Sequence, residues 1–452
     1  MAASRHAPPG PRRWLPGSNY LPFRRNPAAF FARLAREHGD FVRFRLGPRQ
    51  LTLLNHPDFI KEVLVTQSRH FMKGEALQRG KRLLGEGLLT SEGEFHLRQR
   101  RLAQPAFHRQ RIAAYSEVMA RYAGRASRRW QDAARVDMAQ EMMRLTLAIV
   151  AKTLFDAEIE DEASEIGRAM TDVLEIFSFL TLPFSQWFEH LPLAPVRRFE
   201  RAKARLDATI FRLIEQRRAD GRDHGDLLSM LLLAEDAEGG GGRMTTQQVR
   251  DEAITLFIAG HETTAVALTW TWFLLSQHPD AEARLHSELD SVLAGRVPSA
   301  DDIPRLTFAE MVFTETMRLY PPAWAIGRRA LRDVEVGGYV IPAGTVAVTS
   351  PWVTHRDPRF FAEPEKFDPL RWTPEARAAR HKYSYFPFGA GPRACIGEPF
   401  AWMEGVLLLA TLAQRWRARL APGHVPEVYP LITLRPKGGM PMILERRSSA
   451  SF

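Results

Sequence analysis

The 452-residue chain has a single cysteine, Cys395. One cysteine excludes an intrachain disulfide and is typical of a reducing compartment, so we expect a cytoplasmic protein. Nowhere do about 18 apolar residues follow one another, so no transmembrane helix is expected. Residues 1–20 carry prolines and charges where a signal peptide needs an apolar run, which predicts a flexible leader.

No long block of Lys and Arg accompanies the net charge of +10, which comes from 62 basic and 52 acidic residues. A basic balance favours acidic partners. Because the excess is spread along the chain, we expect no nucleic-acid binding. Internal repeats are also missing, and 45% hydrophobic residues are enough for a large core.

Helical periodicity dominates the chain. The clearest helix begins with a capping box at Thr245 and Gln248 and ends before Pro279. It is apolar nearly all round, yet its centre carries a glycine, a charged residue and two threonines. A mid-helix glycine costs about 1 kcal/mol relative to alanine. Such a weak centre in a buried helix favours a functional interruption over incidental polarity.

The remaining elements follow from shorter patterns. Residues 27–38 predict a helix, and 235–244 predict a flexible glycine-rich connector. Alternating segments predict three sheet elements, namely a hairpin over 41–55, a second small sheet over 334–350 and a last hairpin from 428–436 and 439–447. The fold class is therefore mainly α with small β-sheets (α+β), and we expect residues 21–452 to form one domain.

Cys395 lies in the glycine-rich stretch FGAGPRACIG, just before an apolar helix. A nearby arginine and a helix N-terminus both favour a thiolate. A thiolate can serve as a nucleophile, a zinc ligand or a haem ligand. The sequence identifies no base or oxyanion site for the first role, and no further Cys or His at ligand spacing for the second. Haem iron needs only one protein ligand on one side.

The spacing Phe388-x-x-Gly391-x-Arg393-x-Cys395-x-Gly397 resembles the haem-binding signature of the cytochrome P450 family. Further family motifs occur in the family's order. Glu315-Thr-Met-Arg318 resembles the E-x-x-R element, and residues three apart share a helix face. Segment 364–372 resembles the partner segment of that element, and AGHETT (259–264) resembles the oxygen-activation motif.

The resemblance implies a cytochrome P450 fold, with haem b between the long central helix and the Cys-loop helix and Cys395 as the thiolate ligand. It implies that Thr263 and Glu262 deliver protons for O₂ activation. Glu315, Arg318 and Arg371 are expected to form a structural ion triad. The implied cofactor contacts are His96, Arg100, Arg328, Phe388, Gly389, Arg393, Gly397 and Ala259.

The implied reaction is hydroxylation or epoxidation of a hydrophobic small molecule. By family position, the substrate pocket is lined by Leu89, Ala259, Ala323, Ala325 and Ile432. The proline-broken loop 180–195, with Phe184, Trp187 and Phe188, resembles the access lid. Similarity to fatty-acid-hydroxylating members suggests fatty acids, terpenoids or similar lipophiles.

No flavin or iron–sulfur module is recognisable in the chain, so electrons from NAD(P)H are expected to arrive through a ferredoxin or flavodoxin plus its reductase. Five arginines predict a basic dock for that partner, and they are Arg98, Arg100, Arg101, Arg109 and Arg111. We expect a monomer. Open alternatives are a peroxide-driven peroxygenase or isomerase, a haem-thiolate binding or sensing protein without turnover, and a cysteine hydrolase built on Cys395.

Overall fold

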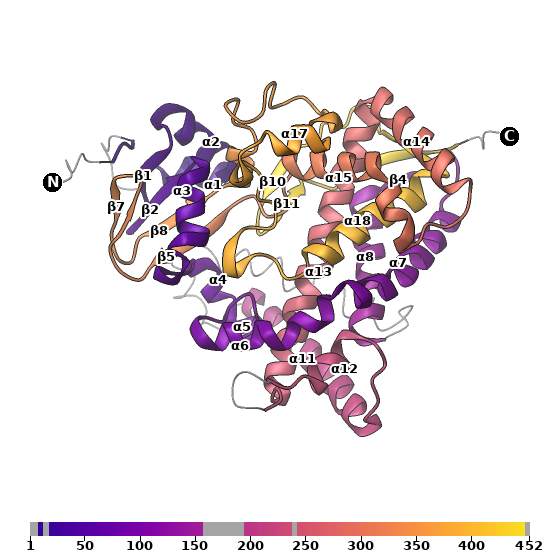
Figure 1. The fold of residues 1–452 in the computed structure, drawn as a ribbon, viewed down its shortest axis with the longest axis horizontal. Coiled ribbons are helices and arrows are strands. Elements are labelled where there is room, and N and C mark those ends of the chain that lie inside the picture. Colours follow the sequence, from indigo (N-terminus) through magenta and orange to yellow (C-terminus); the bar gives the residue numbers. More distant parts are fainter. Residues whose placement is uncertain (1–7, 12–17, 157–193, 237–241, 448–452) are drawn as a thin grey trace. The chain divides into compact units, whose positions relative to one another are not determined.

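A computed structural model describes residues 8–11, 18–156, 194–236 and 242–447. Helices predominate and the sheets are small, which confirms the expected fold class (Figure 1). The chain divides into two compact units, each assembled from separate stretches of sequence. The first unit contains residues 1–75, 311–395 and 426–437, and the second contains 76–310, 396–425 and 438–452. Among the described residues, no helix has both the length and the apolar character needed to cross a membrane.

The first unit carries most of the strands. Its helices are α1 (Tyr20–Arg25), α2 (Pro27–His38), α3 (Pro57–Lys61), the end of α15 (Thr307–Leu319), α16 (Pro351–Thr354) and α17 (Pro374–Ala378). Its short turns of helix are η1 (Glu62–Thr66), η2 (Ser68–His70), η5 (Pro369–Trp372), η6 (Lys382–Ser384) and η7 (Gly391–Arg393). Its strands are β1 (Phe41–Leu46), β2 (Arg49–Leu54), β3 (Phe71–Lys73), β5 (Ile326–Ala330), β6 (Val334–Val336), β7 (Tyr339–Ile341), β8 (Val346–Thr349), β10 (Val428–Pro430) and β11 (Leu434–Pro436).

The main sheet of the first unit has the order β1-β2-β8-β5-β3. β1 and β2 form the predicted hairpin, with Phe41 opposite Leu54. The prediction of one small sheet over 334–350 is wrong in part. β6 and β7 do pair with each other, but β8 joins the main sheet, parallel to β2 and antiparallel to β5. β8 has a strand on each edge and its side chains are almost all buried, as is typical of an interior strand. Alternation along the sequence cannot identify such distant partners.

The second unit is mostly helical. Its helices are α4 (Glu75–Arg79, of which residues 76–79 belong here), α5 (Lys81–Leu84), α6 (Gly93–Ala103), α7 (Arg109–Arg129), α8 (Met138–Phe155), α11 (Ala194–Asp220), α12 (Leu227–Leu233), α13 (Thr246–Gln277), α14 (Pro279–Leu293), the start of α15 and α18 (Glu398–Ala413). It also contains η3 (Gln104–Phe107), η4 (Ala300–Arg305), β4 (Arg135–Asp137), β9 (Trp416–Leu420) and β12 (Pro441–Arg446).

α13 is the central helix of the second unit, and its predicted start and stop are confirmed. The Thr245 side chain accepts a hydrogen bond from the Gln248 backbone N–H, and the Gln248 side chain binds the Thr245 backbone in return. α13 packs along α8, where the Thr146 hydroxyl donates to the His261 carbonyl at 2.9 Å. A Cβ added at Gly260 would lie 3.2 Å from Val150, so the mid-helix glycine also permits this close packing.

The predicted last hairpin is wrong in its pairing. Segment 428–436 forms a hairpin of its own, in which β10 pairs with β11 in the first unit. Segment 439–447 contains β12, which pairs with β4 and β9 in the second unit. Met442 and Leu444 of β12 are fully buried. These two side chains are covered by the helices of the second unit, and the strand that precedes β12 in the sequence, β11, belongs to the first unit.

Candidate active site

The loop that ends at Cys395 has a constrained backbone. Gly389 and Gly391 have positive φ angles of 73° and 72°, which L side chains rarely adopt. A Cβ at Gly391 would lie 2.1 Å from the Leu64 carbonyl oxygen, so the loop lies directly on the η1 backbone. The Cys395 backbone N–H donates to the Phe388 carbonyl at 2.9 Å and closes the loop. Cys395 itself is exposed.

His355 fixes the start of this loop. The Phe386 backbone N–H donates to Nε2 of His355 at 3.0 Å, so that ring nitrogen carries no proton. Complete burial lowers the pKa of His355 well below its usual value, and the nearby Arg318 and Arg356 guanidinium groups lower it further. The imidazole is therefore neutral and acts as a rigid acceptor. Arg318 donates to the His355 carbonyl at 2.9 Å, which joins the loop to the next feature.

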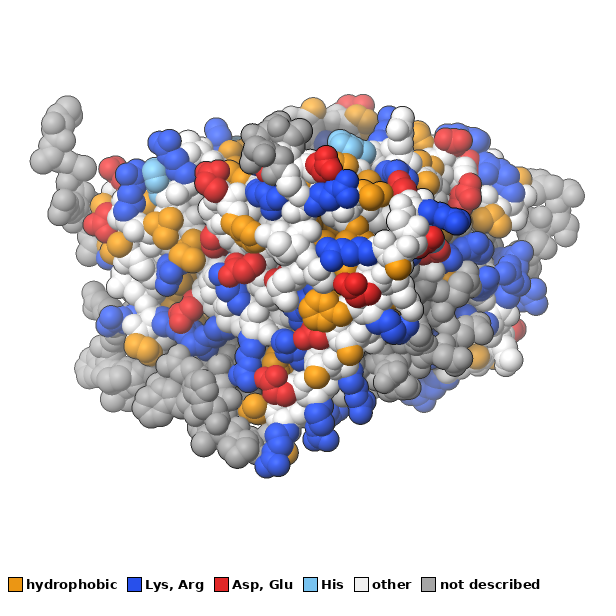
Figure 2. Space-filling model, turned by 90° about the horizontal axis from the view of Figure 1, so that it is seen from below, with side chains coloured by type: hydrophobic (Ala, Val, Ile, Leu, Met, Phe, Trp, Pro, Cys, Tyr) orange, Lys and Arg blue, Asp and Glu red, His pale blue; other side chains and the backbone are white. Residues whose placement is uncertain are grey.

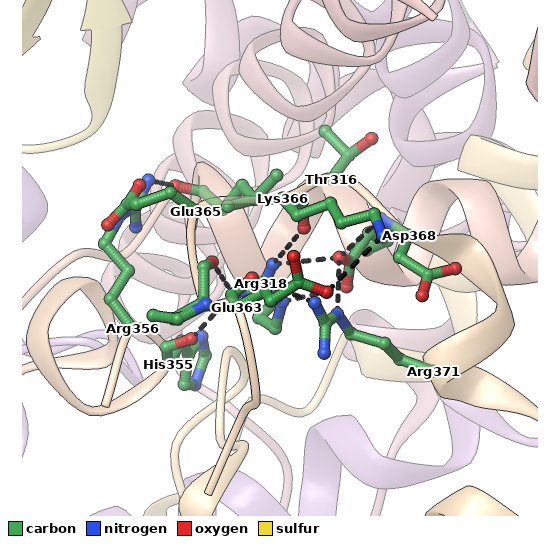
Figure 3. Close-up of polar contacts among 12 residues, drawn as sticks. Thr316, Arg318, His355, Arg356, Glu363, Glu365, Lys366, Asp368 and Arg371 are labelled. Carbon is green, nitrogen blue, oxygen red and sulfur yellow. Dashed lines mark hydrogen bonds and ion pairs between the residues drawn. The ribbon is translucent and has the colours of Figure 1, made fainter. Parts of the chain in front are cut away.

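Glu315 and Arg318 form a fully buried ion pair, with Nη2–Oε1 and Nε–Oε2 distances both of 2.8 Å (Figure 3). Arg318 also donates to the carbonyls of Pro364 at 2.6 Å and Lys366 at 3.0 Å. Arg371 lies 3.4 Å from the Glu315 carboxylate. A buried ion pair pays its desolvation cost only when its remaining hydrogen-bonding positions are filled. The hydrogen-bonding positions of Glu315 and Arg318 are filled in this way, so both side chains are held in place.

Sequence reasoning missed two further partners of this network. The Trp372 indole N–H donates to Glu315 Oε2 at 2.8 Å. The Tyr385 hydroxyl donates to the Thr314 carbonyl at 3.1 Å, and its ring packs 4.4 Å from the ring of Trp372, centroid to centroid. Tyr385 immediately precedes Phe386, so the network holds the cysteine loop at a second point. Aromatic residues in the stretches around Arg371 and before Phe388 were the available signal.

The centre of α13 is the exposed part of a buried helix. Ala259 is exposed and Gly260 and Thr263 are half-buried, while residues 249–258 before them and 264–272 after them are all buried. The Thr263 hydroxyl donates to the Ala259 carbonyl at 2.7 Å, so it is held in the helix rather than withdrawn from it. Its oxygen can still accept a further hydrogen bond. Glu262 is only 3% exposed, so its carboxylate lies off the exposed strip.

Glu404 on α18 is a buried acid that the sequence reasoning missed. Complete burial raises the pKa of Glu404 to about 8, and the neighbouring Thr264 hydroxyl offsets only part of that shift. The carboxyl group is therefore mostly protonated at neutral pH. The signal was present in the sequence, since Glu404 interrupts an otherwise apolar helix.

The expected propionate contacts lie on three elements. His96 and Arg100 lie one turn apart on α6 in the second unit, and His96 is 4% exposed. In the first unit, Arg328 is a buried residue of β5, and Arg393 lies in η7, two residues before the cysteine. Arginine side chains are of the type that carboxylates bind.

Three of the expected pocket residues lie together in the first unit. The hairpin that carries Ile432 is bound to the segment of Ala323 and Ala325 by the Trp324 indole N–H, which donates to the Leu431 carbonyl at 2.9 Å, and by the Leu434 backbone N–H, which donates to Pro322. In the second unit, Leu89 packs on the core next to α13, and Ala259 is on α13 itself. Most of the predicted lid, residues 180–193 with Phe184, Trp187 and Phe188, lies outside the described residues.

Three arginines of the predicted dock are paired with acidic side chains. Arg98 and Arg101 both lie 3.3 Å from the buried Asp236 carboxylate, and Arg111 lies 3.0 Å from Asp223. These acids follow the arginines far along the sequence and reduce the positive charge of the segment. The ion pairs of Asp236 also hold one end of the predicted flexible connector, residues 235–244. Figure 2 shows acidic side chains among the many basic ones on the face it displays.

Comparison with known proteins identifies the family. A model of the family described as "Cytochrome P450" matches residues 8–441. The chain belongs to this family. Two Streptomyces melanosporofaciens proteins are similar to it, namely cyclooctatin synthase (43% identical, covering 94% of this chain and 92% of the relative) and cyclooctat-9-en-7-ol 5-monooxygenase (40% identical, covering 88% of this chain and 86% of the relative).

Pentalenene oxygenase from Streptomyces avermitilis is 37% identical, and the alignment covers 88% of each chain. The crystal structure of the cytochrome P450DA heme domain superposes with a TM-score of 0.88 at 27% identity, covering 97% of this chain and 98% of that one. The expected cytochrome P450 fold is thereby confirmed, and so is the expected activity, a monooxygenase of hydrophobic small molecules.

The residues of this cytochrome P450 fit a haem. Cys395 offers an exposed thiol on a braced loop. Within 8–11, 18–156, 194–236 and 242–447, no three His, Cys, Asp or Glu side chains gather as metal ligands. A lone thiolate suits a metal that brings its own equatorial ligands, as haem iron does. Arg328 and Arg393, which belong to the same unit as Cys395, carry the positive charge that propionates would bind.

Proposed function

We propose that Cys395 would hold haem b as its thiolate ligand and that the enzyme oxygenates a terpenoid. The observation that carries the first part is the exposed thiol on a loop whose every bend is fixed by glycine geometry, His355 and the Glu315–Arg318 pair. A loosely held thiolate would let the iron move. Because these contacts hold the cysteine loop, they would give the bound iron a defined position.

Haem supplies the oxidising chemistry, and the protein supplies position and protons. Thr263 presents its hydroxyl oxygen at the exposed strip of α13, where it can hold a water or the substrate oxygen in place. Glu262 is the acid next to it and can pass protons inward through water. Arg100, Arg328 and Arg393, with His96, are the residues that would bind the propionates and so orient the cofactor.

The terpenoid assignment rests on the relatives. Cyclooctat-9-en-7-ol 5-monooxygenase and pentalenene oxygenase are named for terpenoid substrates, and both align with 88% of this chain. The five expected pocket residues, Leu89, Ala259, Ala323, Ala325 and Ile432, are all apolar and none is aromatic. A hydrocarbon skeleton matches such a lining, and fatty acids are the competing class.

Electrons are proposed to come from NAD(P)H through a ferredoxin or flavodoxin and its reductase, delivered to a monomeric haem domain that comprises residues 21–452. A cytoplasmic location remains part of the proposal. The peroxygenase alternative predicts a different result, because hydrogen peroxide alone would then support product formation at the full rate without redox partners.

The test begins with the reduced CO complex of the purified protein. The thiolate-type Soret band should be present, and Cys395→Ala should abolish it; an unchanged band in the variant would remove Cys395 as the ligand. Binding spectra with terpenoid alcohols and with fatty acids then test the substrate class. Tighter binding of fatty acids throughout would refute the terpenoid assignment. Turnover with a surrogate ferredoxin, its reductase and NAD(P)H, compared with hydrogen peroxide, separates the two routes.

A further inference from the structure

Three consecutive charged residues are buried near the start of α13. Arg250, Asp251 and Glu252 are 3%, 4% and 0% exposed. They lie two turns before the AGHETT motif, and the proposed function does not use them. Burying a charge costs several kcal/mol unless it is paired and hydrogen-bonded. The hydrogen-bonding partners of these three side chains therefore show which segments of the chain they hold together.

Both carboxylates accept hydrogen bonds from the backbone of one short segment, Gly85–Leu88, which we call the 85–88 segment. The Glu86 N–H donates to Asp251 Oδ2 at 2.8 Å, and the Leu88 N–H donates to Glu252 Oε2 at 2.9 Å. Hydrogen bonds to an ionised acceptor are about twice as strong as neutral ones. Because the donors are backbone groups, these bonds fix the path of the chain whatever side chains it carries.

The two glycines of the 85–88 segment permit this close approach. A Cβ at Gly85, which has a φ of +59°, would lie 2.1 Å from the Asp251 carboxylate. A Cβ at Gly87 would lie 2.2 Å from the Thr255 hydroxyl. The Thr90 hydroxyl donates to the Gly85 carbonyl at 2.6 Å and closes the segment on itself. The segment is thus pressed onto α13 more closely than any other residue type allows.

Arg250 extends the cluster to α11. It donates through Nη1 to Asp251 Oδ1 and through Nε to Asp207 of α11, both at 2.9 Å. Lys203 lies 2.6 Å from the other oxygen of Asp207. Beside the segment, Arg82 of α5 lies 2.5 Å from Glu200 of α11. One charged cluster therefore joins α13, α11 and the 85–88 segment within the second unit.

We propose that Asp251 and Glu252 are positioning residues that set substrate selectivity by fixing the backbone of the 85–88 segment. Leu89 follows that segment directly, and its placement decides how much room the substrate has. The proposal rests on the proposed function, because it requires Leu89 to face the substrate. Asp251 and Glu252 act through the backbone and do not touch the substrate themselves.

Asp302 offers a matched control. It is 3% exposed, accepts the Ser299 backbone N–H at 2.9 Å and binds Arg296 at 2.7 Å, so like Asp251 it is a buried carboxylate that binds one backbone N–H and one arginine. Its partners belong to η4 and the preceding turn, and none of them is in the 85–88 segment. Asp251→Ala and Asp302→Ala should therefore destabilise the protein in similar ways, but only the first should alter selectivity.

The readout is the ratio of the dissociation constants of geraniol and geranylgeraniol, measured from the spin-state shift of the holoenzyme. Glu252→Ala and Asp251→Ala should change this ratio about tenfold, since each removes a buried charge-assisted hydrogen bond. The ratio for Glu252→Gln should equal that of the wild type, because the amide oxygen still accepts a hydrogen bond from the Leu88 N–H. Asp302→Ala should leave it unchanged. An unchanged ratio in Glu252→Ala, with the CO band intact, would overturn the proposal.

Hydrogen exchange of the unmodified holoenzyme covers the case in which the alanine variants fail to fold. The amides of Glu86 and Leu88 should exchange slowly, because both are bonded to buried carboxylates. Exchange at the rate of an unprotected loop would also overturn the proposal. Failure of the proposed function is a separate result, since it would appear as a missing thiolate-type CO band in the unmodified protein.

Discussion

Replacing Glu404 by glutamine should stabilise the protein increasingly as the pH rises. Burial raises the pKa of Glu404 from 4.5 to about 8 in the folded state. Between these values the native protein holds a proton that the unfolded chain releases. The wild type therefore keeps its full stability below pH about 4.5 and loses it progressively as the pH rises through about 8. Glutamine cannot ionise, so the variant lacks this loss.

The magnitude follows from the two pKa values. Each pH unit between them removes about 1.4 kcal/mol of stability. The wild type should lose about 1.5 kcal/mol by pH 5.5 and about 4.5 kcal/mol by pH 8, so the variant should gain about 3 kcal/mol on it over this interval. A constant cost of burying the glutamine amide shifts both values equally and leaves the pH dependence intact.

The assay is urea unfolding of the holoenzyme, followed by far-UV circular dichroism at several pH values from about 5.5 to 8. Glu117→Gln is the control, because Glu117 is an exposed residue of α7 and its replacement should leave the difference from wild type constant. A difference between Glu404→Gln and wild type that does not grow with pH would refute the reasoning. It would mean that the Glu404 carboxyl ionises in the folded protein as readily as in water.

Three further perturbations test the site. Gly391→Ala should lower the melting temperature more than Gly344→Ala. Both glycines have φ angles above +70°, but only a Cβ at Gly391 would collide with a backbone atom, the Leu64 carbonyl oxygen. Equal losses of melting temperature would contradict the steric argument. Arg318→Met should cost about 3–5 kcal/mol of unfolding free energy by stranding the Glu315 carboxylate, a loss that Arg318→Met with Glu315→Leu should largely reverse. Thr263→Ala should retain the CO band while diverting NAD(P)H oxidation to hydrogen peroxide, and an undiminished yield of product per NAD(P)H would exclude a role in proton delivery.

Much of the site follows from local spacing. Glu315 and Arg318 lie on one helix face because they are three residues apart, and the structure places their charged groups in contact. The bounds of α13 follow from the capping box at Thr245 and the proline at 279 in the same way. These features depend on residues within about one turn of each other, so no tertiary information is needed to predict them.

Strand partners and the partners of buried acids could not be predicted from local spacing, because they come from distant segments of the chain. β8 was predicted to pair with its neighbours in sequence, but it pairs with β2, nearly 300 residues earlier, and with β5, which satisfy the hydrogen-bonding groups along its two edges. Likewise, Asp236 binds Arg98 and Arg101 from more than 130 residues away. Alternation and charge counts identify what a segment must bury or neutralise, but they cannot identify which distant segment does so.

The sequence by itself determined the helices, the family motifs and the cysteine loop, because each is encoded by residues whose relative positions the backbone already constrains. Only the tertiary structure decided that Glu404 is buried and protonated, that neutral His355 holds Phe386, and that Asp251 and Glu252 bind the 85–88 segment. Each of these depends on dielectric surroundings or on hydrogen bonds between distant stretches of chain. Such interactions exist only once the chain has folded, so the spacing of residues along it does not reveal them.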